Sequence, residues 1–356
     1  MHLDYGYGIR KLILGKKSLL KIIDFGDNQI FPEQTTYTCL LFLHQPSKNF
    51  YYLKLPRLNF PKEIEKHLLN KHSSLLKESL EKISTAPWLL LTKEEKIIVN
   101  KLNSLSSSLK SMVEQIIVGL QTSADHIYIL KKLGVKDSLI RAYSYSLKKE
   151  VILEPGLLKP LVSGEDIDRY AYLETDKLLI FPYAIEKEGA RLIGAKEFAE
   201  KYPKTWAYLC LHEKELRDRE KGKMDHDKWY AFGRTQNLNK HERAKLGVAR
   251  LADRLKVIGD FEGRVYFDNV DVNGILLKTK VSYKGAYILC LLNSKLLDWR
   301  FKLSSVPFRG NFYSANKQFI SPLPIRRISF VTPENERKRL LKKFKKMYYD
   351  FLKEGN

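Results

Sequence analysis

The spacing of apolar residues changes near residue 116, and no other feature of the sequence constrains the fold as strongly. After this point, apolar residues form short runs typical of strands, bounded by glycine or proline, at 127–130, 178–181, 256–258, 265–268 and 274–277. Two stretches with helical spacing, 204–221 and 285–303, interrupt these runs. Short strands grouped between such helices predict an α+β fold.

Residues 1–58 have the pattern of the end of a larger domain. A short basic and apolar helix is predicted over 8–20, and apolar strands are predicted over 20–25 and 37–43, on either side of a turn at 26–28. The strands form either a hairpin or two strands at the edge of a sheet. A piece of this size cannot bury its own apolar faces, so we expect it to pack on another body.

The next segment, 59–114, is predicted to be a connector of two helices. Apolar residues recur at helical spacing over 61–83, with a proline in the first turn. The second helix begins at Thr92, which forms a capping box with Glu95. The serine-rich residues 104–108 either continue the apolar stripe of this helix or break it.

A basic helix is predicted over 331–356. Thr332 is its N-cap, and Pro333 occupies the first helical position. Seven of the ten residues from 337 to 346 are Lys or Arg, and they back an apolar stripe. This basic face either contacts a DNA backbone, docks a partner subunit or is solvated.

The chain is long for a single core and strongly basic. Its 356 residues favour two domains, because single cores rarely grow far beyond about 250 residues. The net charge of +22 suits a polyphosphate partner, but membranes and acidic proteins also attract basic chains. The three isolated cysteines indicate neither a disulfide framework nor a zinc site and fit a reducing cytoplasm. Because the sequence shows no signal peptide and no long apolar run, we expect a cytoplasmic protein that binds no membrane.

Residues 22–43 resemble a segment of a known enzyme family. The motifs are IIDFGD at 22–27, FP at 31–32 and TTYT at 35–38. They resemble the last strands of the catalytic domain in TaqI-type adenine-N6 DNA methyltransferases, including those fused to restriction nucleases. In that family an aromatic residue of this segment stacks on the target adenine after it has flipped out of the duplex, and the matching residue here is Phe31. The alternative is a phenylalanine that packs in a core or hairpin.

The resemblance is denser in the region that matches the family's specificity domain. The matching motifs are VGLQTS at 118–123, LKPL at 158–161, GEDI at 164–167, IFPY at 180–183, WYAFGRTQNL at 229–238, LLNS at 291–294, GNFY at 310–313 and PLP at 322–324. Ser123 stands where the family has a glycine, which puts the shape of that turn in doubt. The likeness covers roughly residues 8–327.

This resemblance assigns a role to each segment. Residues 1–58 are the end of a methyltransferase catalytic domain, 59–114 a helical connector, 115–330 a TaqI-like specificity domain and 331–356 a basic helix. The implied function is sequence-specific recognition of double-stranded DNA within a truncated or split adenine-N6 methyltransferase of a restriction-modification system. The alternative is a stand-alone nucleic-acid-binding protein without a methyltransferase partner.

Motifs for the chemistry itself are missing from the sequence. Methyl transfer to an adenine amine needs a glycine turn after a strand and a Pro-Pro-aromatic loop, yet the chain has no Pro-Pro pair, and its G-x-G at 6–8 has no room for a preceding strand. The acidic clusters at 186–188 and 225–227 are predicted to be solvated surface rather than metal sites. We therefore predict no catalytic residue, no metal site and no cofactor in this chain. S-adenosylmethionine is expected in a catalytic half that a separate polypeptide supplies, or else the gene is a remnant.

Two loops, 229–239 and 309–317, are predicted to face DNA, because each combines guanidinium, amide and aromatic groups with glycine. The arginines predicted to pair with guanine or phosphate are Arg234 and Arg309. The amides predicted to contact adenine edges are Gln236, Asn237, Asn239 and Asn311. The aromatic residues that either stack on bases or hold the loops on the core are Trp229, Tyr230, Phe312 and Tyr313. The predicted site is completed by two lysines, Lys240 and Lys317.

Overall fold

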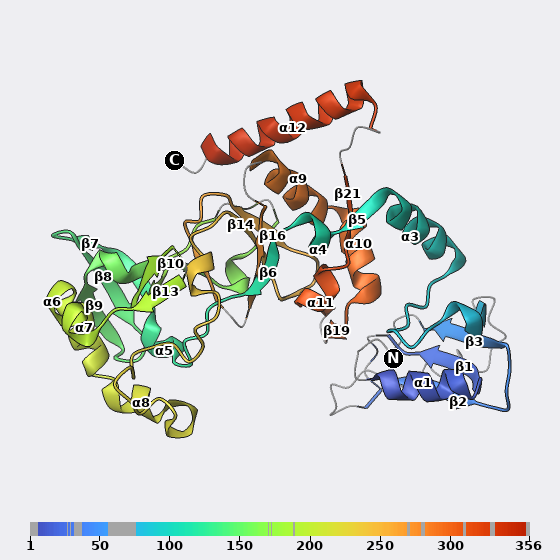
Figure 1. Cartoon of the computed structure of the whole chain (residues 1–356), viewed down its shortest axis with the longest axis horizontal. Helices are drawn as coiled ribbons and strands as arrows, with labels where there is room; N and C mark the ends of the chain where they lie inside the picture. Colours follow the sequence, from blue (N-terminus) through green and yellow to red (C-terminus); the bar gives the residue numbers. More distant parts are fainter. Residues whose placement is uncertain are drawn as a thin grey trace. The chain divides into compact units, whose positions relative to one another are not determined.

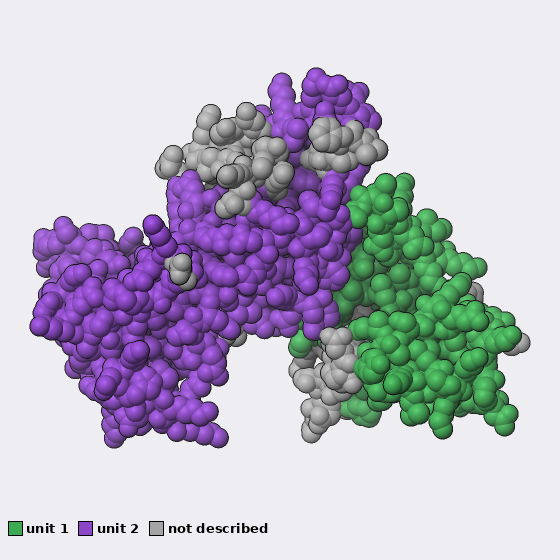
Figure 2. All heavy atoms as spheres, viewed as in Figure 1, with its two compact units in different colours: residues 1–106, 252–254, 298–314 green, residues 107–251, 255–297, 315–356 purple. Residues whose placement is uncertain are grey.

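The computed structural model describes most of the chain (Figure 1). The described residues are 6–26, 28, 30–31, 38–55, 76–169, 171, 173–187, 189–268, 271–278, 282–308, 311–327 and 332–353; for 282–284, 345, 348–349 and 351–353 only the backbone is described. The chain divides into two compact units (Figure 2). Unit 1 comprises 1–106, 252–254 and 298–314, and unit 2 comprises 107–251, 255–297 and 315–356. Each unit is described by itself.

Unit 1 is built on a four-stranded sheet in the order β2-β1-β3-β4. Its strands are β1 (Leu19–Asp24), β2 (Cys39–Leu43), β3 (Asn49–Lys54) and β4 (Leu76–Ser79). β1 runs antiparallel to β2 and parallel to β3, and β3 runs antiparallel to β4. Helix α1 (Tyr7–Gly15) supplies Ile13 to a core formed with Leu19, Phe50 and Trp88. The predicted helix and the two predicted strands of the first segment are confirmed.

The predicted helix over 61–83 is wrong at its C-terminal end. Residues 56–75 lie outside the described part, but Leu76–Ser79 is strand β4, followed by the 3-10 turn η2 (Leu80–Lys82). Pairing with β3 satisfies the backbone groups of this segment, and Leu80 is buried against the sheet. Tertiary pairing has therefore overridden the local periodicity.

Helix α3 (Lys93–Leu105) confirms the predicted start and resolves its end. Thr92 accepts from the backbone N–H of Glu95 at 3.2 Å, and the Glu95 carboxylate accepts from the backbone N–H of Thr92 at 2.8 Å. Ser106 has extended backbone angles, so the serine-rich run breaks the helix.

Unit 2 contains a six-stranded sheet in the order β17-β10-β11-β7-β8-β9. Its strands are β7 (Ile129–Lys136), β8 (Leu139–Ser144), β9 (Lys149–Leu153), β10 (Leu158–Val162), β11 (Lys177–Ile180) and β17 (Tyr266–Phe267). Residues of this sheet share one buried cluster with Phe198, Leu209 and Leu216 of three helices, α6 (Ala195–Lys201), α7 (Pro203–Cys210) and α8 (Glu213–Gly222). The single helix predicted over 204–221 is thus two helices, because His212 between them has non-helical backbone angles.

A second sheet of unit 2 is antiparallel throughout, in the order β16-β14-β18-β6. Its strands are β6 (Gln115–Val118), β14 (Lys245–Ala249), β16 (Val257–Asp260) and β18 (Val272–Leu276). Helix α9 (Ser282–Leu292) contacts β14 and β16, and the basic helix α12 (Glu334–Lys353) packs on α9. The rings of Tyr287 and Phe344 meet there with centroids 4.8 Å apart.

The remaining described elements are short. They are β5 (Ser106–Ser108), α4 (Leu109–Met112), α5 (Asp125–Tyr128), η3 (Pro155–Leu157), η4 (Gly164–Asp166), β12 (Tyr183–Glu186), β13 (Gly189–Leu192), η5 (Leu238–Lys240), β15 (Leu251–Ala252), α10 (Lys295–Ser304), β19 (Pro307–Phe308), β20 (Phe312–Ser314), α11 (Lys317–Ile320) and β21 (Pro324–Arg326). The molecule mixes helices and sheets, as an α+β protein does. The division into the four predicted segments stays a prediction. Among the described helices, none is long and apolar enough to cross a membrane.

Candidate nucleic-acid interface

The first predicted DNA-facing loop, 229–239, begins inside the core of unit 2. Trp229 and Tyr230 are only 4% and 2% exposed. Their rings pack on Trp206, with centroids 5.6 and 5.2 Å away, and the Tyr230 hydroxyl donates to the carbonyl of Ile193 at 2.7 Å. These two aromatics therefore hold the loop on the core, and the predicted stacking on bases is corrected for both, because burial leaves their rings no open face.

A buried arginine, Arg219, ties this loop to two other segments. Its Nε donates to the carbonyl of Leu216 at 2.9 Å and its Nη1 to that of Thr122 at 2.6 Å. Its Nη2 donates to the carbonyls of Trp229 and Ala231 at 2.6 and 2.9 Å. One planar guanidinium thus donates hydrogen bonds to carbonyls of helix α8, of the turn at 121–123 and of the loop at 229–239. No sequence signal indicated this role, since Arg219 lies in a strongly charged run.

The loop then passes very close to the turn that holds Ser123. The backbone N–H of Gly233 donates to the carbonyl of Thr122 at 3.1 Å, and that of Arg234 donates to the carbonyl of Gln121 at 3.2 Å. A Cβ on Gly233 would lie 2.0 Å from the Ser123 Oγ, so only glycine fits. Ser123 itself has a φ of +60°, so this turn keeps the left-handed conformation that glycine favours.

Arg234, the residue after Gly233, has an exposed side chain. Its Nη1 contacts both carboxylate oxygens of Glu220 at 3.1 and 3.2 Å, and the side chain is 53% exposed. The Ser123 Oγ donates to the same carboxylate at 3.0 Å, and these two contacts hold the pKa of Glu220 below its ordinary value. Within the described part of the chain, Nε and Nη2 of Arg234 have no hydrogen-bond partner, so one edge of the guanidinium is open.

The rest of the first loop divides between solvent and the protein. Gln236 is exposed, whereas Asn239 is half-buried. Asn237 has a φ of +64°, and its Nδ2 donates to the carbonyl of Val118 at 3.4 Å. The Lys240 Nζ donates to the side-chain carbonyl of Gln115. Asn237 and Lys240 therefore fasten the loop to β6, whereas Arg234, Thr235 and Gln236 are exposed.

The second predicted loop, 309–317, is described only in part. Arg309 lies outside the described residues. Asn311 is exposed and has a φ of +65°, and Phe312 is 41% exposed. Tyr313 is half-buried, with the Lys302 Nζ 5.4 Å from its ring centroid.

The residues of the two loops are divided between the two units. Asn311, Phe312 and Tyr313 belong to unit 1, whereas the first loop and the exposed Lys317 belong to unit 2. A single reading surface made of both loops therefore stays a prediction.

Phe31, the residue matched to a base-stacking position, lies between β1 and β2 of unit 1 and is 52% exposed. This exposure argues against a phenylalanine buried in the core of this chain, whereas the alternative of a hairpin phenylalanine stays open, because β1 and β2 pair antiparallel.

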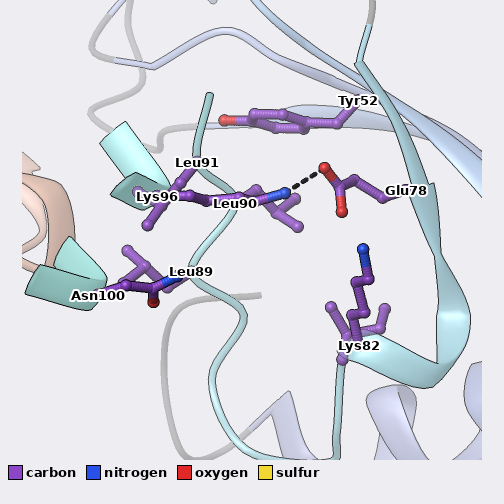
Figure 3. Close-up of a pocket in the computed structure, with 9 residues that line it drawn as sticks. Tyr52, Glu78, Lys82, Leu89, Leu90, Leu91, Lys96 and Asn100 are labelled. Atoms are coloured by element: carbon purple, nitrogen blue, oxygen red, sulfur yellow. Dashed lines mark hydrogen bonds and ion pairs between the residues drawn. The ribbon is translucent and has the colours of Figure 1, made fainter. Parts of the chain in front are cut away.

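Unit 1 contains a pocket of about 270 Å³. Figure 3 shows Tyr52 above an ion pair between Lys96 and Glu78, with Leu90 and Leu91 in the wall. Its lining contains no glycine, and its charged residues are the paired Lys96 and Glu78 together with Lys82. No group of three or more His, Cys, Asp or Glu residues in the described ranges is placed to hold a metal ion.

Nearly the whole chain is similar to parts of two known proteins. No family model matches the sequence. A curated protein of Escherichia coli, the type II restriction enzyme and methyltransferase RM.Eco57I, is 29% identical over 353 residues, which cover 94% of this chain and 34% of that protein. The type IIG restriction endonuclease BpuSI aligns in three dimensions with a TM-score of 0.43 and 12% identity, over 97% of this chain and 40% of that one. The chain is thus homologous to a protein of a restriction-modification system and spans about a third of its length.

Proposed function

We propose that this chain recognises a specific sequence in double-stranded DNA for an adenine-N6 methyltransferase of a restriction-modification system, in the cytoplasm. The observation that carries the proposal is the anchored loop of unit 2: two buried aromatics and Arg219 fix its backbone, and Arg234 and Gln236 stand open at its surface. A fixed backbone that presents an arginine and an amide suits hydrogen bonding to base edges. The net charge of +22 and the homology to RM.Eco57I support DNA as the partner.

In this proposal the methyl-transfer chemistry belongs to protein outside this chain. A methyltransferase catalytic polypeptide binds S-adenosylmethionine and the flipped adenine, and Phe31 stacks on that base. The chain supplies the specificity domain and no catalytic group, and is inactive as an enzyme alone.

Base recognition is tested with a randomised duplex library and the purified chain. We expect one enriched sequence, and Arg234→Ala should weaken binding to it by about 1 to 3 kcal/mol and relax the preference at one position. Arg141→Ala is the matched control, because Arg141 is 42% exposed and also pairs with a glutamate, Glu150, at 2.6 Å. Equal affinity for all duplexes, or a preference for RNA, contradicts the proposal and favours a stand-alone nucleic-acid-binding protein.

The assignment of chemistry is tested with labelled S-adenosylmethionine and the selected duplex. Methyl transfer is expected only when the methyltransferase polypeptide of the same restriction-modification system is added. Transfer by this chain alone would show that the catalytic assignment is wrong.

A further inference from the structure

Arg234 and Arg141 both pair with a glutamate, but the two pairs use different parts of the guanidinium. Glu150 accepts from Nε and Nη2 of Arg141 at 2.6 and 2.9 Å, so it occupies an edge that carries two parallel N–H groups. Glu220 contacts only Nη1 of Arg234, at 3.1 and 3.2 Å, and the carbonyl of Gly233 accepts from the same nitrogen at 3.1 Å. Among the described residues, the edge formed by Nε and Nη2 of Arg234 has no partner, and it can donate two parallel hydrogen bonds.

The backbone that carries Glu220 has an unfavourable conformation. At the end of α8 the helical angles stop at Arg219, which has a ψ of 149°, and Glu220, Lys221 and Gly222 then have φ of +52°, +64° and +79°. Residues with a side chain adopt this left-handed region rarely, and then singly rather than in series. Such outliers persist where surrounding contacts over-determine them, and they concentrate at functional sites. The carboxylate of Glu220 is thus held in place against the preference of its own backbone.

The contacts that hold this carboxylate also hold the loop that carries Arg234. The Ser123 Oγ donates to the Glu220 carboxylate at 3.0 Å, and the turn at 121–123 accepts from the backbone N–H groups of Gly233 and Arg234. Arg219, the residue before Glu220, donates to two carbonyls of the loop. The orientation of Arg234 is therefore set through its main chain and its side chain together.

The Glu220 carboxylate also changes what Arg234 can bind. A phosphate is attracted by the positive charge of an arginine, and a carboxylate 3.1 Å from the guanidinium offsets that attraction. The edge of a guanine base is neutral, and an arginine recognises it by two hydrogen bonds, to O6 and N7. An arginine that keeps an open edge beside a carboxylate is thus better suited to a guanine than to a phosphate.

We propose that Glu220 is a positioning residue that commits Arg234 to a guanine in the recognised sequence. Glu220 holds Nη1 and offsets the charge that would draw Arg234 to a phosphate. Nε and Nη2 are left to donate to O6 and N7 of the base in the major groove. This inference rests on the proposed function and adds the identity of one recognised base and the residue that determines it.

Replacing Glu220 by alanine tests both effects in the full chain. Glu220→Ala should lower the preference for guanine, at the position that depends on Arg234, by about tenfold, which is within the range of one bidentate contact. Its affinity for a duplex that lacks the selected sequence should rise, and the salt slope of that binding should steepen by up to about one. Damage to the fold alone would weaken binding to both duplexes. The duplex library gives the preference, and fluorescence anisotropy gives the affinities.

A conservative variant separates orientation from charge. In Glu220→Gln the side-chain carbonyl can still accept from Nη1 of Arg234, so most of the guanine preference should return. Affinity for the unselected duplex should stay raised, because the negative charge is absent. Glu150→Ala is the control, since it removes a carboxylate from Arg141 at the surface and should leave the guanine preference unchanged.

The identity of the base is tested with the unmutated chain, so misfolding of a variant cannot hide the answer. In the selected duplex the guanine is replaced by 7-deazaguanine, which lacks the N7 acceptor, or by hypoxanthine, which keeps O6 and N7 and lacks the amino group of the minor groove. We expect 7-deazaguanine to weaken binding at least about fivefold and hypoxanthine to weaken it far less.

The outcomes distinguish this inference from the proposed function. An unchanged guanine preference in Glu220→Ala, a fall in its affinity for both duplexes, or full binding to 7-deazaguanine overturns the role of Glu220. A position that depends on Arg234 but prefers another base also overturns it and leaves the proposed function standing. If the unmutated chain shows no base preference, the proposed function fails and this inference fails with it.

Discussion

At the scale of single residues, Arg219 determines the shape of the candidate interface. Arg219 is only 7% exposed, and its guanidinium donates to four carbonyl oxygens from three segments. The Trp229 and Ala231 carbonyls would otherwise be left without a donor among the described residues, at about 1 to 3 kcal/mol apiece, whereas the Thr122 carbonyl also accepts from the backbone N–H of Gly233.

Arg219→Lys is therefore expected to lower the free energy of unfolding by about 3 kcal/mol or more, because an ammonium cannot reach all four acceptors with the geometry of a planar fork. Urea unfolding measures it. Arg141→Lys is the control: Arg141 is 42% exposed and pairs with Glu150 at the surface, so its replacement should change stability far less than that of Arg219. Equal effects of the two changes would show that the burial of Arg219 is unimportant.

Gly233 carries a second prediction at this scale. A methyl group there would overlap the Ser123 Oγ, so Gly233→Ala should destabilise the protein by about 1 to 3 kcal/mol and weaken binding to the selected duplex. Adding Ser123→Gly should restore part of the stability, since it removes the overlapping atom at a position with a φ of +60°. Gly189→Ala serves as control because nothing lies within 4 Å of its Cβ position. A thermal melt of all four proteins checks this, and an unaltered Gly233→Ala protein would contradict the close approach.

At the scale of elements, the antiparallel sheet of unit 2 encloses a polar group of three side chains. Lys245 and Asp260 face each other on β14 and β16 as an ion pair, and both are almost fully buried. The Lys245 Nζ also donates to the carbonyl of His241, whose ring stacks on Tyr266 with centroids 5.4 Å apart. Burial and the Lys245 cation lower the pKa of His241 to about 3.

This group makes the sheet sensitive to acid. The depressed folded pKa of His241 means that, below the ordinary value of about 6.5, the unfolded state binds a proton that the folded state excludes. Stability from this residue is complete above pH 6.5 and falls as pH decreases toward 3, by up to about 1.4 kcal/mol per pH unit. Urea unfolding between pH 7.5 and 4 checks the slope, and His241→Gln should flatten it. An identical slope in that variant would refute the assignment to His241.

At the scale of the whole molecule, the net charge of +22 should govern the proposed association with DNA. Non-specific binding releases counterions from phosphates, so its affinity should fall by about a thousandfold or more between 50 and 200 mM salt if six or more phosphates are contacted. Fluorescence anisotropy with a duplex that lacks the selected sequence measures this. Arg234→Ala should change base preference far more than the salt slope, since a single arginine accounts for a slope of at most about one. Binding that does not depend on salt would rule out a phosphate-dominated contact.

The sequence alone determined much of the local structure. Elements whose signals are local were predicted correctly: the Thr92 capping box, strands β1 and β2, and the α+β mixture. Capping, alternation and turn chemistry act over a few neighbouring residues, so one sequence suffices to read them. The resemblance to a restriction-modification family rests on motifs of the same local kind, and the homology to RM.Eco57I supports it.

Only the tertiary structure decided which of the predicted residues face outward. Trp229 and Tyr230 became core, Arg234 stayed open, and Leu76–Ser79 became a strand because β3 was available to pair with it. The role of Arg219 depends on carbonyls up to 97 residues away, which no local pattern encodes. Burial and long-range hydrogen bonding are properties of the folded chain as a whole, since each is set by the residues that packing brings alongside.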